Sequence, residues 1–248
     1  MLKVSGASKT FQGQQIFSDF DMTVPHGEFH IMIGPSGCGK STLLDGLTGT
    51  VELDRGSIIW NGCRLTDLSR HAAYMQQKDM LLPWLSLYDN ACLPARVGSP
   101  GTGASKETVF QLLGRLGLGG YESHMPAQVS GGMRQRCALA RTLMFNRELI
   151  LLDEPLSALD TITRSRLQSL LLMLQVEFKK TILMITHDID EALILADTIY
   201  LLSKQPMGIL ERYRPDLPKP RTFNHPALLD IKLDVVKRLE QGGNRETG

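Results

Sequence analysis

Long uncharged hydrophobic runs are absent from this chain of 248 residues. No stretch approaches the roughly 18 consecutive apolar residues that a membrane-spanning helix requires. The first five residues, MLKVS, do not begin the long apolar core of a signal peptide. We therefore expect a protein that is soluble by itself, which leaves open its docking to a membrane partner.

Cysteine is scarce, and neither sign of charge dominates. The four cysteines stand alone at positions 38, 63, 92 and 137, without a C-x-x-C pair. This spacing argues against a zinc site or a disulfide framework and favours reduced thiols in the cytosol. Lys and Arg total 27 against 26 Asp and Glu, for a net charge of +1. Such a balance does not favour a polyanion, and no nucleic-acid partner is expected.

Glycine is concentrated in one stretch, GPSGCGKST at 34–42. A buried strand is expected for the apolar run before it, 29–33, and a helix for the residues after it. In this context the spacing G-x-x-x-x-G-K-S is that of a phosphate-binding loop. Its glycines let successive N–H groups turn toward phosphate oxygens, and the helix start adds a positive dipole end.

A nucleoside triphosphate is the ligand that this loop predicts. The Lys40 ammonium is expected at the β- and γ-phosphates, and the Ser41 hydroxyl at Mg²⁺. The expected nucleotide-binding residues of the loop are Gly34, Pro35, Ser36, Gly37, Cys38, Gly39, Lys40, Ser41 and Thr42.

Two adjacent carboxylates, Asp153 and Glu154, follow the apolar run LILL at 149–152. Ligands of open α/β sheets bind beyond the carboxyl ends of the strands. Asp153 is therefore a candidate for holding Mg²⁺, and Glu154 a candidate general base for an attacking water.

A third motif, VSGGMRQR at 129–136, places a serine and two glycines at the start of a long helix. This is a second anion-binding arrangement in a chain with one complete phosphate loop. It favours a site for the nucleotide of another copy of the chain. From spacing alone, an ordinary serine cap of the helix stays open as the alternative.

The remaining pattern predicts an α/β fold in which helices cover both faces of a parallel sheet. Gly98 to Ser105 has the composition of a flexible surface loop. Strands are expected at 2–4, 16–17, 20–24, 57–60, 72–75, 149–152, 181–185 and 198–202. A hairpin turn is expected at Asn61-Gly62. Helices are expected at 86 onward, 106–116, 131–145, 162–178 and 227–239.

The order of these motifs over residues 1–205 resembles that of ATP-binding cassette (ABC) transporter ATPases. The resemblance implies a P-loop NTPase with a mixed core sheet flanked by helices, an N-terminal antiparallel β-subdomain, a helical subdomain at about 86–146 and a C-terminal tail at 206–248. The matching segments are the phosphate loop, Gln77, Ser130 to Arg136, Asp153-Glu154-Pro155, Ser157-Ala158-Leu159-Asp160 and Thr186-His187-Asp188.

Roles for further residues come from this resemblance. Gln77 resembles the glutamine that reaches Mg²⁺ and the attacking water, although Gln76 stands where an aromatic is common. His187 resembles the histidine that contacts the γ-phosphate, and Asp160 the aspartate of a loop that crosses the dimer seam. Phe11 resembles the aromatic that stacks on adenine, with a core phenylalanine of an edge strand as the alternative. Across a head-to-tail dimer, the γ-phosphate would be bound by Ser130, Gly131 and Gly132.

Two details resemble importers of the nitrate, sulfonate and taurine type, a group that includes thiamine-precursor importers. They are Met133 after Ser-Gly-Gly and the segment LPWLSLYDN at 82–90. The resemblance implies a homodimeric ATPase that uses ATP and Mg²⁺ at the cytoplasmic face of a bacterial inner membrane. Its implied partners are two integral membrane permease subunits and, indirectly, an extracytoplasmic solute-binding protein. Those partners would choose the solute, so this chain does not name it.

Three other functions are less favoured. A soluble ABC-type ATPase that acts on nucleic acid or the ribosome usually carries two cassettes, long coiled-coil insertions or a basic patch, and this chain has none of them. A small-molecule kinase would leave the Ser-Gly-Gly element unexplained. Exporters often fuse the cassette to membrane helices, so import is favoured by resemblance.

Overall fold

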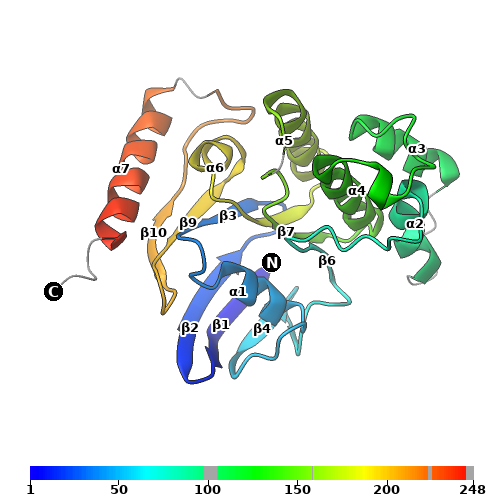
Figure 1. The fold of residues 1–248 in the computed structure, drawn as a ribbon. Coiled ribbons are helices and arrows are strands. Elements are labelled where there is room, and N and C mark those ends of the chain that lie inside the picture. Colours follow the sequence, from blue (N-terminus) through cyan, green and yellow to red (C-terminus); the bar gives the residue numbers. More distant parts are fainter. Residues whose placement is uncertain (98–104, 158, 223–224, 244–248) are drawn as a thin grey trace.

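Two β-sheets form the framework of the computed structural model, which describes residues 1–97, 105–157, 159–222 and 225–243 (Figure 1). The antiparallel sheet has the order β2-β1-β4-β5. Its strands are β1 (Leu2–Phe11), β2 (Gln14–Val24), β4 (Arg55–Trp60) and β5 (Cys63–Leu65). The core sheet has the order β10-β9-β3-β8-β7-β6. Its strands are β3 (Phe29–Ile33), β6 (Ala72–Met75), β7 (Leu149–Asp153), β8 (Thr181–Ile185), β9 (Thr198–Leu202) and β10 (Ile209–Tyr213).

Seven α-helices and one short 3-10 helix complete the described part of the chain. The antiparallel sheet and α1 lie on one side of the core sheet, and α5 and α6 lie on the other (Figure 1). The helices are α1 (Lys40–Leu47), α2 (Leu87–Val97), α3 (Lys106–Arg115), η1 (Pro126–Gln128), α4 (Gly131–Met144), α5 (Thr161–Val176), α6 (Ile189–Leu195) and α7 (Pro226–Gly243).

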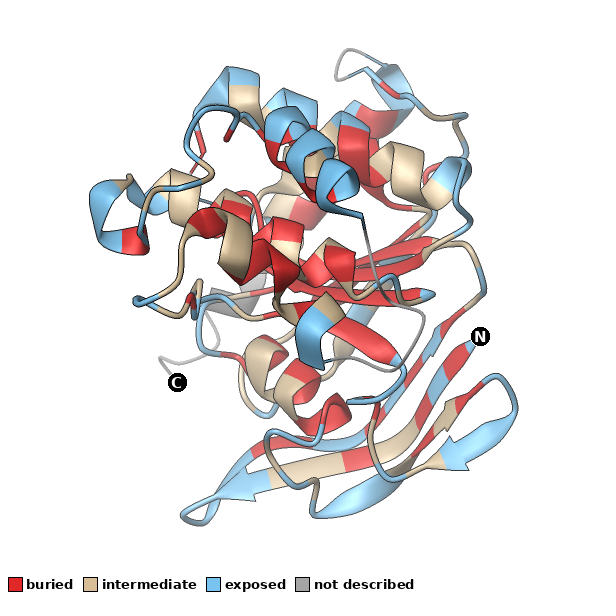
Figure 2. Ribbon diagram, turned by 90° about the vertical axis from the view of Figure 1, so that its right-hand side faces the viewer, coloured by how far each residue is buried: buried red, intermediate tan, exposed pale blue. Residues whose placement is uncertain are grey.

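The core sheet is covered on both faces. Every residue of β3, β7, β8 and β9 is buried, as expected for parallel strands between two layers. Along β3, Ile31 packs in the cluster that includes the helical layer, and Met32 packs in the cluster with the antiparallel sheet and α1. Figure 2 shows the buried residues gathered in this sheet and on the helix faces against it. The predicted α/β fold is confirmed.

The sheet is mixed, as the resemblance implied. Its five strands β9, β3, β8, β7 and β6 are parallel, but the edge strand β10 pairs with β9 in the antiparallel sense. The proline-rich composition of 206–220 hid β10, whose positions alternate between half-buried and exposed without any that is fully buried. The seven-residue α6 was also missed, because so short a helix carries little periodic signal.

The hairpin at Asn61-Gly62 is confirmed, with positive φ values of 51° and 81° at the two residues. The expected strands 16–17 and 20–24 are one strand, β2. Asp19 adopts a φ of 49° inside it, and the register against β1 shifts there without ending the pairing. The separation of these two strands was therefore wrong.

The helical segments agree with their predicted positions to within a few residues. Ser105 caps α3, since its side chain accepts a hydrogen bond from the Thr108 N–H at 3.1 Å. The rest of the predicted loop, 98–104, lies outside the described residues. Within the described part of the chain, no helix is long and apolar enough to cross a membrane.

Arg221 fastens the segment after β10 to α6. Its guanidinium is 9% exposed and donates hydrogen bonds to four carbonyl oxygens. Two of them belong to Leu193 and Ala196 at the end of α6, where helix carbonyls lack intrahelical partners. The described segment from β10 to Arg221 is thus packed against α6.

Candidate functional site

The phosphate loop lies between β3 and α1. At Gly34, an added Cβ would lie 2.9 Å from the Leu202 Cβ, so the backbone approaches β9 too closely for a side chain. Gly39 has a φ of 121°, and a Cβ there would lie 2.6 Å from Cγ2 of Ile16. Gly39 precedes α1 without a side-chain cap, so the first N–H groups of the helix are left to bind a ligand anion.

Lys40 is held inside this loop. Its Nζ donates hydrogen bonds of 2.8 Å to the Gly34 and Pro35 carbonyl oxygens, and the residue is 7% exposed. Cys38 is buried beside it, with Sγ 3.8 Å from Nζ, and burial raises the pKa of the thiol. Ser36 and Gly37 lie exposed at the loop tip, and Thr42 is half-buried in the first turn of α1.

Asp153 ends β7 beneath the loop and is 2% exposed. Burial raises the pKa of its carboxyl, and the hydrogen bond with Ser41 opposes that shift. Oδ1 of Asp153 has no hydrogen-bond partner among the described residues. A buried, unpartnered carboxylate oxygen beside a hydroxyl is a donor set that fits Mg²⁺.

The metal would need ligands besides the protein. No group of three or more His, Cys, Asp or Glu side chains in the described ranges could hold a metal ion. Mg²⁺ commonly binds through one or two carboxylates with substrate phosphates and water, so a small donor set such as Ser41, Asp153 and Gln77 is consistent with a magnesium site.

The side chain of Glu154 meets two other polar side chains from neighbouring strand ends. Its Oε2 lies 3.5 Å from Nδ1 of His187 and accepts a hydrogen bond of 3.4 Å from Nε2 of Gln77. The three residues follow β7, β8 and β6, which are adjacent and parallel and so end at the same edge of the sheet. Gln77 is thus the glutamine beside the carboxylate, whereas Gln76 lines a hollow of about 220 Å³ next to α4.

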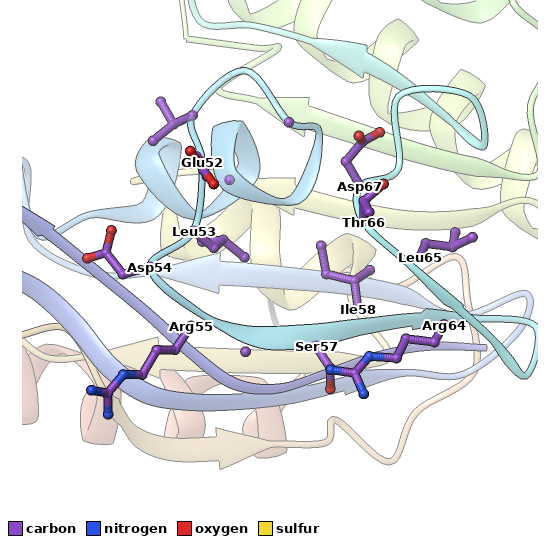
Figure 3. Close-up of a pocket in the computed structure, with 14 residues that line it drawn as sticks. Glu52, Leu53, Asp54, Arg55, Ser57, Ile58, Arg64, Leu65, Thr66 and Asp67 are labelled. Carbon is purple, nitrogen blue, oxygen red and sulfur yellow. The ribbon is translucent and has the colours of Figure 1, made fainter.

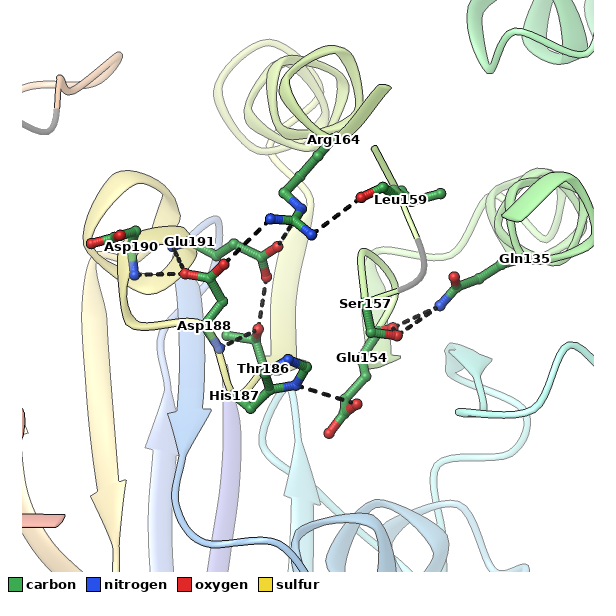
Figure 4. Close-up of polar contacts among 10 residues, drawn as sticks. All are labelled: Gln135, Glu154, Ser157, Leu159, Arg164, Thr186, His187, Asp188, Asp190 and Glu191. Carbon is green, nitrogen blue, oxygen red and sulfur yellow. Dashed lines mark hydrogen bonds and ion pairs between the residues drawn. The ribbon is translucent and has the colours of Figure 1, made fainter. Parts of the chain in front are cut away.

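The backbone of Glu154 is held from α4. Its carbonyl oxygen accepts hydrogen bonds from Nε2 of Gln135 at 2.8 Å and from Oγ of Ser157 at 3.1 Å (Figure 4). Glu154 adopts a φ of 50°, a left-handed conformation that these bonds support. The arrangement can therefore bind triphosphate and Mg²⁺ and present a base to a water near the γ-phosphate.

Ser130, Gly131 and Gly132 remain apart from this centre. Ser130 is exposed at the start of α4, and its Oγ accepts a hydrogen bond of 3.3 Å from the Met133 N–H. In the described part of the chain, no hydrogen bond joins 130–132 to the loop at 34–42. One copy therefore leaves this helix start free for a ligand outside its own phosphate loop.

Phe11 and Asp160 also lie outside the centre. Phe11 is 43% exposed at the end of β1, and Nζ of Lys9 lies 5.0 Å from its ring centroid. Asp160 caps α5, with Oδ1 accepting a hydrogen bond of 3.0 Å from the Thr163 N–H. Ala158, in the same expected motif, lies outside the described residues.

A hollow of about 490 Å³ lies away from the strand ends, between the loop after α1 and the strands β4 and β5 (Figure 3). Its acidic side chains include Asp54, which pairs with Nζ of Lys9 at 2.9 Å, and Asp67, which accepts bonds from Ser69. Because these two carboxylates already have partners, we do not assign a ligand site to this hollow.

Sequence reasoning missed Gln135, Arg164, Thr186 and Glu191 as parts of the site. Gln135 and Thr186 stood inside motifs that were singled out, so their position was a usable signal. Arg164 carried no such signal, because its carboxylate partners are distant in the sequence. They are Asp188, which caps α6, and Glu191 inside that helix.

The family model described as ABC transporter matches residues 17–157. The aliphatic sulfonates import ATP-binding protein SsuB 1 of Xanthomonas axonopodis pv. citri is 40% identical over 241 residues, 96% of each chain. The taurine import ATP-binding protein TauB of Escherichia coli O157:H7 is 40% identical over 212 residues, 86% of this chain and 83% of that protein. The dimeric post-hydrolysis structure of the ATP-binding cassette MJ0796, bound to ADP and Pi, aligns with a TM-score of 0.80 at 28% identity, over 88% of this chain and 100% of that one.

Proposed function

This chain belongs to the ABC transporter family, and from that membership we propose that two copies bind ATP and Mg²⁺ head to tail and hydrolyse ATP to drive import of a sulfonate- or taurine-like solute. The observation that carries the proposal is the convergence of Gln77 and His187 on Glu154, beside the buried carboxylate of Asp153. The names of the relatives support the class of solute, within the broader nitrate, sulfonate, taurine and thiamine-precursor group.

Each chain would hold the triphosphate through its loop N–H groups and the Lys40 ammonium. Ser41 and Asp153 would hold Mg²⁺, with Gln77 reaching toward it, and the ion would supply positive charge to the phosphates. Glu154 would take a proton from the attacking water, and the amide of Gln77 would orient that water. The imidazole of His187 would contact the γ-phosphate and stabilise the charge that develops on it.

The second copy would complete each site. Ser130, Gly131 and Gly132 make no hydrogen bond to the loop at 34–42 within the described residues, and their exposed helix start suits a γ-phosphate across a dimer seam. Asp160 would lie at that seam. Phe11 would stack on adenine, with its exposed ring as the supporting observation. The similar cassette MJ0796 is dimeric in a structure bound to ADP and Pi, which supports an assembly of two copies.

Permease subunits would dock beside Gln77. Met80 is 57% exposed and Trp84 is 69% exposed, an unusual placement for large apolar side chains. A groove of about 470 Å³ includes Met80 in its lining, together with other residues of 77–79, α4 and Ser157. We propose that two integral membrane permeases dock at this surface of the assembly. The surface would adjoin the helical subdomain at about 86–146, which is part of the ATPase domain at 1–205. An extracytoplasmic solute-binding protein would act through them, with this chain at the cytoplasmic face of a bacterial inner membrane.

Size-exclusion chromatography of Glu154→Gln with and without Mg-ATP tests the proposal. We expect ATP to convert monomer to dimer, because binding is retained while hydrolysis is blocked. Glu177→Gln is the control, as Glu177 is exposed at the end of α5. The double variant Lys40→Ala/Glu154→Gln should remain monomeric. A Glu154→Gln monomer at saturating ATP, also when co-expressed with its permeases, would contradict the head-to-tail assembly.

A further inference from the structure

Arg164 on α5 stands between two segments that the proposed function places at the dimer seam and at the γ-phosphate. Its Nη2 donates a hydrogen bond of 3.2 Å to the Leu159 carbonyl oxygen. Its Nη1 lies 3.6 Å from Oδ2 of Asp188, and its Nε lies 3.5 Å from Oε1 of Glu191 (Figure 4). One guanidinium thus contacts the segment before α5 and the segment after β8.

The first of these segments is tied to the helix that carries Arg164. Asp160 caps α5 through its side chain, and its carbonyl oxygen accepts a hydrogen bond of 2.9 Å from the Arg164 N–H. Because Arg164 also bonds the preceding carbonyl, of Leu159, a displacement of Asp160 moves the guanidinium with it.

The second segment surrounds His187. Oε2 of Glu191 accepts a hydrogen bond of 2.7 Å from the Thr186 hydroxyl. The hydroxyl oxygen of Thr186 in turn accepts a hydrogen bond of 3.1 Å from the Asp188 N–H. Both neighbours of His187 in the chain therefore belong to the network that Arg164 contacts. His187 itself lies 3.5 Å from Glu154.

Charge explains why this network depends on Arg164. Glu191 is 3% exposed, and burial raises the pKa of its carboxyl, while the arginine opposes that shift. A buried carboxylate is costly without a positive partner, so the guanidinium offsets part of the cost of burying Glu191, beside the hydrogen bond from Thr186.

We propose that Arg164 is a positioning residue that couples the Leu159–Asp160 segment to His187, so that closure of the dimer seam sets the imidazole against the γ-phosphate. This inference rests on the proposed function. Both carboxylate contacts of Arg164 exceed the usual 2.7–2.9 Å of a charge-assisted bond. A displacement of less than about 1 Å would convert them into such bonds, so a small movement at the seam is sufficient.

A double-mutant cycle between Arg164 and His187 tests the coupling. We expect Arg164→Ala to lower kcat about tenfold and to leave the Kd for ATP within about twofold, because the phosphate loop is untouched. In a His187→Ala background, the same substitution should lower kcat less than about twofold, because its effect passes through His187. Release of labelled phosphate detects the slow turnover of these variants.

Two further variants separate positioning from folding. Arg164→Lys keeps a positive charge beside Glu191 and so preserves the fold, but one ammonium cannot replace the planar fork that reaches three acceptors. We expect a melting temperature near that of the wild type and a kcat that is still reduced several-fold. Arg166→Ala is the matched control, since Arg166 is exposed on the same helix and makes no ion pair within the described residues.

Wild-type kcat in Arg164→Lys, or losses that multiply in the double variant, would overturn the coupling. Failure of the proposed function has a different signature. In that case the wild-type protein would not hydrolyse ATP, or Lys40→Ala would hydrolyse it at the wild-type rate, whatever residue stands at 164.

Discussion

Nδ1 of His187 lies 3.5 Å from Oε2 of Glu154, across the ends of the neighbouring strands β8 and β7. The two residues are 33 positions apart in the chain. Their closeness places an imidazole and a carboxylate at one point, where the proposed mechanism uses a base and a charge-stabilising group.

His187→Ala should therefore lower kcat by about 100-fold and leave the Kd for ATP within about threefold. Steady-state hydrolysis and equilibrium nucleotide binding check the two quantities. The control is His26→Ala, whose side chain is half exposed and contacts Asn61 on the antiparallel sheet. A His187→Ala enzyme with wild-type kcat would remove His187 from the mechanism.

Gly39→Ala should weaken nucleotide binding. The substitution places a Cβ 2.6 Å from Cγ2 of Ile16 at a φ of 121°, so the loop must deform. We expect ATP affinity to fall at least about tenfold and the folding free energy to drop by about 1–3 kcal/mol. Isothermal titration calorimetry and thermal melts measure both effects.

The matched control is Gly114→Ala in α3, where an added Cβ meets nothing within 4 Å. It should raise stability by up to about 1 kcal/mol through helix propensity. Unchanged ATP binding by Gly39→Ala would show that the loop tolerates a side chain at this position.

Asp153→Asn should gain stability and lose activity. Burial raises the folded-state pKa of Asp153, so its contribution to stability is greatest at low pH and is lost as pH rises through that pKa. In metal-free buffer without nucleotide, the Asn variant should melt above the wild type at pH 7.5, and the difference should shrink at pH 5. Mg²⁺-dependent hydrolysis should be absent, because a carboxylate ligand is gone. A lower melting temperature at pH 7.5 would contradict this account.

Arg221→Ala should lower the free energy of unfolding by about 3 kcal/mol, because buried carbonyl oxygens lose a charged donor. Urea unfolding followed by circular dichroism measures the change. Arg55→Ala, at an exposed position on β4, is the control and should stay within about 0.5 kcal/mol of the wild type. Equal effects from the two substitutions would mean that Arg221 does not anchor the segment after β10.

Local features of the chain were predictable wherever neighbouring residues make the structure. The phosphate loop needs glycines, a lysine and a serine at fixed spacing, since its ligands are consecutive N–H groups and adjacent side chains. The strand that delivers Asp153 and Glu154 and the long helices followed from apolar periodicity. The sequence by itself therefore determined the nucleotide chemistry, the α/β class and the family resemblance.

Only the tertiary structure decided which strands are neighbours. The order β6-β7-β8 brings Gln77, Glu154 and His187 together, and β10 makes the sheet mixed. Arg164 reaches Glu191 by the same long-range packing. Strand pairing and helix packing depend on contacts between distant segments, whose partners no local periodicity records. For that reason the residues of each motif were evident from the sequence and the family resemblance implied their shared site, while the strand order that brings them together was decided by the tertiary structure.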